Sequence, residues 1–315
     1  MHLFTKRIVN HITALLAVMC FYSPLQAQTG DTISDKGFWY ASSEYKRERG
    51  RIMAFSTASI YAGSMVGLYS VWYKDYPLSG FHRFNDNEEW LQMDKVGHCG
   101  SAYYLSRWNS ELVGWTGLSP KKSAIWGAGI SYTFLLSVEM LDGHSKEWGF
   151  STGDLIANTI GTGLFLGQAL GWKEQRISFK LSYTKSPLAN QRPSIFGSNI
   201  AENVLKDYNG QTYWLSFNLA DFMKKSSLPA WLNIAVGYGA NNMLTANVEE
   251  TPEGLKYPGE RYRQFYISPD IEWSKIPVKS GALKALFKVL GCIKFPAPAL
   301  EYRKNSGLIF HGLYF

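Results

Sequence analysis

The stretch that decides the fold covers residues 88–172, where apolar, helix-forming segments carry a few ionisable side chains at fixed offsets. Its key pieces read MDKVGH at residues 93–98, EMLDGH at residues 139–144 and GFSTGDLIAN at residues 149–158. Acidic and imidazole groups inside largely apolar helices are costly unless they are paired, hydrogen-bonded or ligated. These side chains are therefore the first candidates for function, although they do not by themselves name a reaction.

The apolar period around this stretch predicts a bundle of about four helices over residues 51–172. A first helix is expected over residues 52–72 and a second from about residue 88 to residue 108. Ser119 followed by Pro120 is a strong signal for the start of a third helix, which ends near Gly143. Ser151 and Asp154 resemble a capping box at the start of the fourth helix, which runs to about residue 171.

Beyond residue 175 the period changes to two, which indicates strands. Ile177, Phe179 and Leu181 share one face, and Ser178 and Lys180 share the other. Similar patterns recur near residues 213–219, 232–238, 263–273, 294–302 and 307–315, and an amphipathic helix is predicted over residues 280–291. About six strands are fewer than the roughly eight of the smallest transmembrane barrels. The predicted fold is therefore α+β: an apolar helical bundle followed by an antiparallel β-sheet or a partial or small β-barrel.

The N-terminus has the form of a secretory signal, with Lys6 and Arg7 before a short apolar run and a cleavage box that ends at Ala27. Cys20 raises the alternative of a lipoprotein, but Met19 is a poor fit because lipoprotein processing requires a small residue there. We expect a signal peptide at residues 1–27, an extension at 28–50, a helical domain at 51–173 and a β-rich, outer-membrane-type domain at 174–315.

The bulk composition excludes some classes of function. The formal net charge of +7 comes from dispersed basic residues, and there is no arginine-rich stripe of a nucleic-acid module. The 11 Trp and 19 Tyr residues suit either a membrane interface or an aromatic-rich core. Cys99 and Cys292 remain after signal cleavage, and their spacing neither requires a disulfide nor forms a zinc pattern. Asn209 and Gly210 predict a tight hairpin turn.

Asp94 and His98 lie four residues apart and therefore share one helical face. This spacing suits two metal ligands, or an aspartate that orients an imidazole. If the helices are neighbours, Glu139 and Asp154 can converge with this pair. Carboxylates with one histidine suit a divalent metal ion with open coordination positions. The same groups also suit general acid–base chemistry, because burial and like charge raise the pKa of a carboxyl group.

A purely structural interpretation competes with these two, because buried Asp–His and Glu–Asn networks often only fix helix register. Asp154 in particular can be no more than a helix cap. The residues of such a polar network are Asp94, Lys95, His98, Glu139, Asp142, Ser151, Asp154 and Asn158. The structural, metal-binding and acid–base interpretations all remain open at this stage.

The same residues resemble the YfiM-like family of uncharacterised bacterial envelope proteins, described as predicted periplasmic proteins or lipoproteins. The resemblance covers residues 73–172 and rests on residues 90–98, on Glu139 with residues 142–143, and on residues 149–151 with Asp154 and Asn158. A looser similarity links this pattern to the VanZ-like membrane proteins. The whole chain looks like the longer version of the YfiM-like family seen in the Bacteroidota. The resemblance implies an envelope location and a four-helix core, and no established substrate.

Two functional hypotheses follow. In the first, the protein is a non-catalytic accessory subunit of an outer-membrane protein complex in biogenesis or export. It would then lie at the periplasmic side of the outer membrane, in contact with the lipid bilayer and with no nucleic-acid partner. In the second, it is a metal-dependent envelope hydrolase or transferase on a lipid or cell-wall substrate, and it uses Asp94, His98, Glu139 and Asp154.

Overall fold

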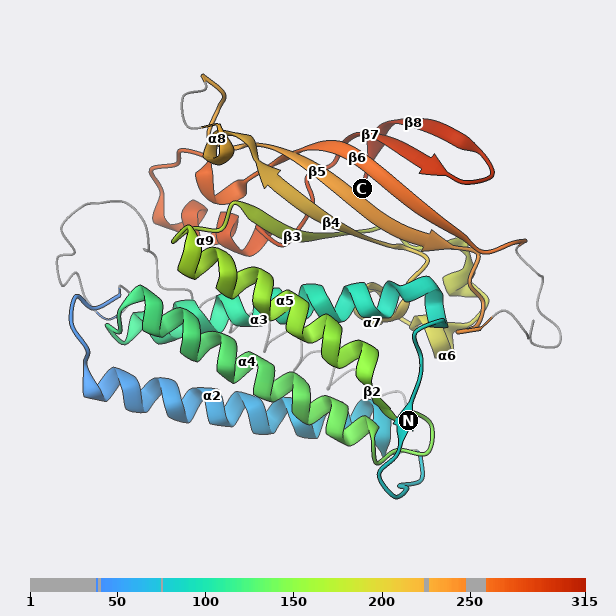
Figure 1. The fold of residues 1–315 in the computed structure, drawn as a ribbon, viewed down its shortest axis with the longest axis horizontal. Helices are drawn as coiled ribbons and strands as arrows, with labels where there is room; N and C mark the ends of the chain where they lie inside the picture. Colours follow the sequence, from blue (N-terminus) through green and yellow to red (C-terminus); the bar gives the residue numbers. More distant parts are fainter. Residues whose placement is uncertain (1–37, 39–40, 75, 224–226, 248–258) are drawn as a thin grey trace. The chain divides into compact units, whose positions relative to one another are not determined.

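The computed structural model describes residue 38 and residues 41–74, 76–223, 227–247 and 259–315 (Figure 1). The predicted signal peptide over residues 1–27 lies outside the described residues. The chain forms two compact units, one of residues 1–86 with 101–175 and the other of residues 87–100 with 176–315. Each unit is described below by itself.

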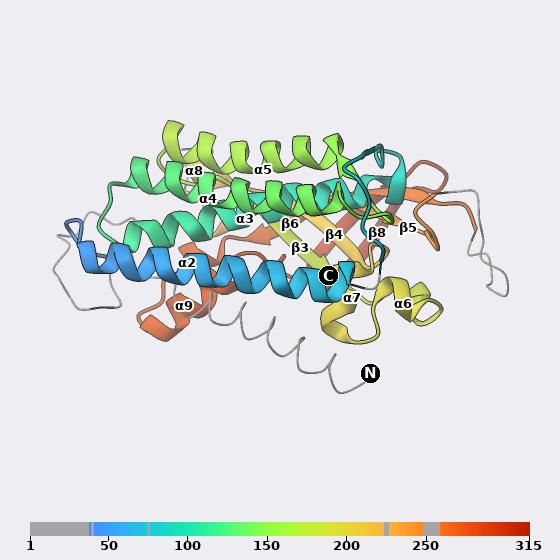
Figure 2. The same ribbon diagram turned by 90° about the horizontal axis from the view of Figure 1, so that it is seen from below.

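The first unit is helical, and its helices lie side by side (Figure 2). Tyr61 joins two of them through a hydroxyl contact with Ser137 and an edge-to-face ring contact with Phe134 at 5.4 Å. Gly127 allows a further close approach, because a Cβ at this position would lie 2.2 Å from the backbone nitrogen of Ser110. The elements are α2 (Arg47–Leu68), the π-helical turn η1 (Tyr69–Tyr73), residues 101–115 of α3 (Met93–Trp115), α4 (Pro120–Asp142), α5 (Thr152–Gly171) and the paired short strands β1 (Arg83–Phe84) and β2 (Phe150–Ser151).

Helix α4 begins with Pro120 in its first turn, as the sequence predicts, and ends at Asp142 just before Gly143. Its length and composition would suffice to cross a membrane, with a mean hydropathy of 1.3 over its most apolar window. The buried core helix of a soluble protein meets the same criteria, so this feature by itself decides nothing.

The second unit is built on a six-stranded antiparallel sheet whose strands follow one another in chain order (Figure 1). This arrangement confirms the predicted α+β class and the predicted strands. The strands are β3 (Ile177–Tyr183), β4 (Gln211–Asn218), β5 (Leu232–Asn241), β6 (Tyr262–Ile271), β7 (Ala297–Arg303) and β8 (Gly307–Tyr314). The connecting helices are η3 (Pro187–Asn190), α6 (Pro193–Phe196), α7 (Ile200–Lys206), α8 (Leu219–Phe222), η4 (Trp273–Lys275) and α9 (Gly281–Leu290), the last of which is the predicted amphipathic helix.

The sheet curls but is not a closed barrel, since β8 and β3 form no ladder within the described residues. The outer edge of β3 is covered by a later segment. Leu181 donates its backbone N–H to Cys292 O at 2.9 Å and accepts one from Lys294 at 3.0 Å. The Thr184 hydroxyl also donates to Phe315 O at 2.5 Å. No disulfide joins Cys99 to Cys292 in the described part of the chain.

Buried charges line the inner face of the sheet and are paired there. Lys180 Nζ lies 2.7 Å from Asp270 Oδ2, and Lys294 Nζ lies 3.8 Å from Asp270 Oδ1. Glu301 accepts a hydrogen bond from Gln264 Nε2 at 2.8 Å and lies 2.7 Å from His311 Nε2. Pairing of this kind offsets the cost of removing the charges from water.

Two local predictions are wrong. The helix expected from about residue 88 begins at Met93, because Trp90 and Leu91 adopt left-handed backbone angles with φ of 48° and 49° inside the 3-10 turn η2 (Glu89–Gln92). Asn209 and Gly210 lie in a turn that leads into β4, as predicted, and the Gly210 N–H donates to Asp207 O at 2.9 Å, but the turn is not a hairpin between two strands. The two residues connect α7 to β4, and the Asn209 side chain instead bonds the backbone of Met243 through both its amide nitrogen and its oxygen.

Candidate functional site

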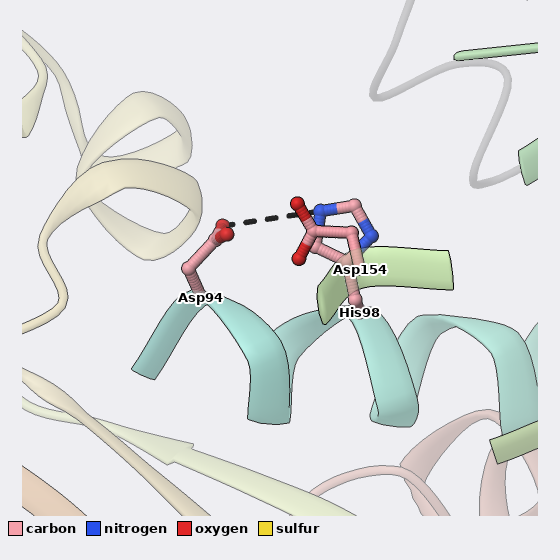
Figure 3. A group of neighbouring side chains, drawn as sticks. All are labelled: Asp94, His98 and Asp154. Atoms are coloured by element: carbon pink, nitrogen blue, oxygen red, sulfur yellow. Dashed lines mark ion pairs between the residues drawn. The ribbon is translucent and has the colours of Figure 1, made fainter. Parts of the chain in front are cut away.

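The polar motif of the second unit lies on the first two turns of α3. Asp94 and His98 project from one helical face, and Asp94 Oδ1 lies 3.9 Å from His98 Nε2 (Figure 3). The two oxygens of Asp94 have further partners. The Tyr208 hydroxyl donates to Oδ1 at 2.7 Å, and Lys95 Nζ donates to Oδ2 at 3.1 Å. The predicted i, i+4 relation between the carboxylate and the imidazole is thus present in the structure.

The electrostatics around Asp94 favour its ionised form. Burial would raise the pKa of this carboxyl group, but the positive charges of His98 and Lys95 and the hydrogen bond from Tyr208 oppose that effect. The net result is a pKa below the ordinary aspartate value. The carboxylate is therefore available at neutral pH either as a ligand or as the acceptor that holds Tyr208.

The start of α3 is fixed by its close packing against the sheet and by the hydrogen bonds of the turn that precedes it. A Cβ at position 97 would lie 2.8 Å from the Tyr213 hydroxyl, so Gly97 lets the helix approach β4 closely. The Trp90 N–H donates to Ala246 O at 3.0 Å, and the Tyr238 hydroxyl donates to Leu91 O. A left-handed backbone conformation is costly for residues other than glycine. These contacts therefore stabilise the left-handed angles of η2.

The polar motif of the first unit begins at the N-terminus of α5. The Ser151 hydroxyl accepts the backbone N–H of Asp154 at 3.1 Å, as the predicted cap requires, and donates to Asp86 Oδ1 at 2.6 Å. Asp154 lies in the first turn of α5, where the helix dipole favours a negative charge. It is buried, and so is Asn158 one turn later. Figure 3 also draws Asp154, which belongs to this unit.

A second acidic group lies at the C-terminal end of α4. The Tyr73 hydroxyl donates to Asp142 Oδ1 at 2.5 Å. Burial raises the pKa of Tyr73 well above its ordinary value, and the negative charges of Asp142 and Glu139 raise it further. Glu139 is completely buried in α4. Tyr73 therefore stays protonated and acts as a hydrogen-bond donor.

The structure thus brings Asp94, Lys95 and His98 together in one unit, and Ser151 together with Asp154 in the other. The convergence of Asp94, His98, Glu139 and Asp154 on a single site involves both units and stays a prediction. The sequence analysis missed three residues that bond the motif: Tyr208, Tyr73 and Asp86. Tyr208 lies 114 residues from Asp94, so no periodicity could have linked them.

This arrangement can support two kinds of role. An ionised carboxylate beside an imidazole on one helical face can take up a divalent cation or move a proton. The same contacts can also serve only to fix helices, since Tyr208 ties Asp94 to the segment before β4 and Ser151 caps α5.

Comparison with known proteins gives one match. Residues 82–166 match the model of a family described as "Predicted periplasmic lipoprotein (DUF2279)", whose members are uncharacterised. The matched segment includes every residue of the predicted polar network. No curated protein and no solved structure matches the chain. Over these residues the chain is therefore similar to an uncharacterised family of the cell envelope.

Proposed function

We propose that this protein is an outer-membrane-associated envelope protein that acts as a non-catalytic accessory subunit of an outer-membrane assembly for protein biogenesis or export. The observation that carries the proposal is the exposed apolar surface of the helical unit. Phe55 on α2 is 77% exposed and Trp126 on α4 is 62% exposed, and Ile156 and Ile160 are exposed on α5. Large exposed apolar patches are typical of surfaces that bind a protein or a membrane.

The proposal treats the polar motif as architecture. Ser151 is committed to capping α5 and to Asp86, and Asp94 is committed to Tyr208 and Lys95. It also takes the chain to be a YfiM-like protein, because the family match covers the residues of the helical motif on which that resemblance rests. The assignment to the long type rests on residues 206–214 and 294–302, which lie outside the matched segment. In this proposal the helical domain of residues 51–173 binds the partner proteins.

The test is extraction of the tagged full-length protein from its native membranes in mild detergent, followed by sizing and mass spectrometry. We expect a stoichiometric set of outer-membrane proteins. The double variant Trp126→Glu with Ile160→Glu should lose these partners, while Lys121→Glu, an exposed change on the same helix, should retain them. Recovery of the wild type only as a free monomer would count against the proposal.

The Asp94–His98 pair favours a second candidate, a metal-dependent envelope hydrolase or transferase on a lipid or cell-wall substrate. Both side chains are partly exposed, which leaves them accessible to a cation. In this candidate Glu139 and Asp154 supply further carboxylate ligands for a divalent metal ion.

Metal analysis tests this candidate directly. The purified wild type should retain a divalent metal, and His98→Ala and Asp154→Ala should each lose it while remaining folded by circular dichroism. His144→Ala, which removes an exposed imidazole outside the group, is the matched control and should retain the metal. Equal metal content in all four proteins contradicts the candidate, and unfolding of the His98 and Asp154 variants favours the architectural role.

A further inference from the structure

We infer that the outward face of strands β5–β8 lies in the acyl-chain layer of a lipid bilayer. The inference deepens the proposed function and rests on it, because it names the surface through which the sheet contacts the membrane. Its basis is the distribution of side chains on the sheet of the second unit, where the exposed face is apolar and the buried face carries charged and polar groups around an aromatic cluster.

The outward face carries apolar rows that run straight across neighbouring strands. One row joins Val236 on β5 to Ile267 on β6, then Leu300 on β7 and Phe310 on β8, and each is the register partner of the next. All four side chains are exposed, Phe310 to 71%. A second row of exposed side chains joins Phe265, Tyr302 and Leu308. Rows at this spacing form one continuous surface.

The inward face of the same strands is buried and carries charged and polar groups around an aromatic cluster. On β6 the inward residues alternate with the outward residues Phe265 and Ile267; they are Gln264, Tyr266, Ser268 and Asp270. A sheet with one face in water normally has the opposite alternation, with apolar residues on the buried side. Apolar side chains outside and polar side chains inside are typical of strands that face lipid.

Within the second unit, other elements cover only part of the outward face. At β3 and β4 the first turns of α3 lie on the sheet, since Gly100 approaches the Phe179 ring and Gly97 approaches the Tyr213 hydroxyl. No comparable element of the described second unit covers the rows on β5–β8, whose side chains remain exposed. The uncovered area is therefore a distinct surface that needs an apolar environment.

Basic residues at one end of these strands favour lipid over a protein partner. Arg263 is the second residue of β6 and lies on the outward face, and Arg303 and Lys304 follow Tyr302 at the end of β7. Arg261 lies just before β6 and donates to the backbone oxygens of residues 246 and 247. The acidic residues at this end include Glu260, Glu89, which accepts a hydrogen bond from Asn247, and the buried Glu301, which pairs with Arg303. An apolar surface with cationic groups at its border complements acyl chains next to anionic phosphate headgroups.

Spin labelling of the full mature protein in vesicles of phosphatidylethanolamine and phosphatidylglycerol tests the inference. In a background with Cys99→Ser and Cys292→Ser, a nitroxide is attached at Ile267→Cys or at Phe310→Cys. The matched control is Asn305→Cys, an exposed polar position in the β7–β8 turn. We expect both face labels to be accessible to oxygen and protected from a water-soluble nickel chelate, and the control label to show the opposite behaviour.

Two results would overturn the inference. Nickel access at positions 267 and 310 would mean that the face lies in water, and protection from both reagents would mean that protein covers it. The charge variant Ile267→Glu with Phe310→Glu gives an independent readout and should reduce co-flotation with the vesicles at unchanged circular dichroism. These vesicles contain no partner proteins, so failure here is distinguishable from failure of the complex to appear in native membranes.

Discussion

At the scale of single residues, Asp94 shows how one carboxylate can join distant parts of a unit. It accepts hydrogen bonds from its sequence neighbour Lys95 and from Tyr208, which follows α7. Charge assistance makes such hydrogen bonds stronger than those between neutral groups. The contact with Tyr208 therefore contributes to stability whichever role the Asp94–His98 pair has.

Removing the Tyr208 hydroxyl tests this contribution. We expect Tyr208→Phe to lower the free energy of unfolding by about 1.5–3 kcal/mol, because a charged acceptor loses a donor. Urea unfolding of the detergent-solubilised protein measures the change. Tyr302→Phe removes an exposed hydroxyl and should have almost no effect. An equal loss of unfolding free energy in both variants would show that the hydrogen bond from Tyr208 to Asp94 makes no particular contribution to stability.

Lys294 gives a prediction for pH dependence. Burial lowers the pKa of its ammonium group to about 8, against an ordinary value of 10.5, and Lys180 contributes to the lowering while Asp270 opposes it. Between these two values the unfolded chain binds a proton that the folded chain does not. Unfolding then takes up a proton, so stability should rise as the pH increases from about 8 to about 10.5.

Lys294→Met removes the group whose pKa differs between the folded and unfolded states and should therefore abolish this rise, which can amount to a few kcal/mol. Asp270 stays paired in the variant, because Lys180 Nζ lies 2.7 Å from its Oδ2. Thermal or denaturant unfolding at a series of pH values measures it. Lys304→Met removes an exposed lysine and should leave the slope unchanged. A wild-type protein whose stability stays level or falls over this range contradicts the assignment.

At the scale of elements, the contact between α3 and α4 depends on a missing side chain. Gly127 faces the backbone of Ser110, which cannot move aside as the end of a long side chain can. Gly129 lies two residues further along the helix, and a Cβ there would meet nothing within 4 Å. The two glycines of one helix therefore predict opposite effects for the same substitution.

We expect Gly127→Ala to destabilise the protein by about 1–3 kcal/mol, since the added methyl group forces the helices apart. Gly129→Ala should stabilise it by up to about 1 kcal/mol, because alanine is the better helix former. Paired unfolding curves measure both changes. A shift of stability in the same direction for both variants would contradict the close contact between α3 and α4.

The elements also show what the sequence can predict. Periods of 3.6 and two residues located the four long helices, the amphipathic helix α9 and the six strands of the large sheet. The short elements η3, α6, α7 and α8 were not predicted. The Ser151 cap was predictable because its partner, Asp154, is local. The start of α3 was not, because the left-handed turn at Trp90 and Leu91 depends on contacts with Ala246 and Tyr238, far along the chain.

At the scale of the whole molecule, processing of the N-terminus decides how the protein is held in the envelope. We expect cleavage after Ala27, with Gln28 as the first mature residue, since Met19 is too large for lipoprotein processing at Cys20. The description of the matched family as lipoproteins makes this a sharp test. Intact-mass analysis of the membrane form measures it, and a diacylglycerol-modified Cys20 would contradict it.

The way the edge of β3 is covered has a consequence for folding. The segment that bonds Leu181 comes just before β7, and the Thr184 contact with Phe315 spans 131 residues. A chain that emerges N-terminus first therefore exposes an unpaired strand edge until its last residues have emerged. Such an edge is a template for aggregation. Completion of the sheet is thus a late step of folding, and the β3 edge can pair with other chains until the C-terminal segment arrives.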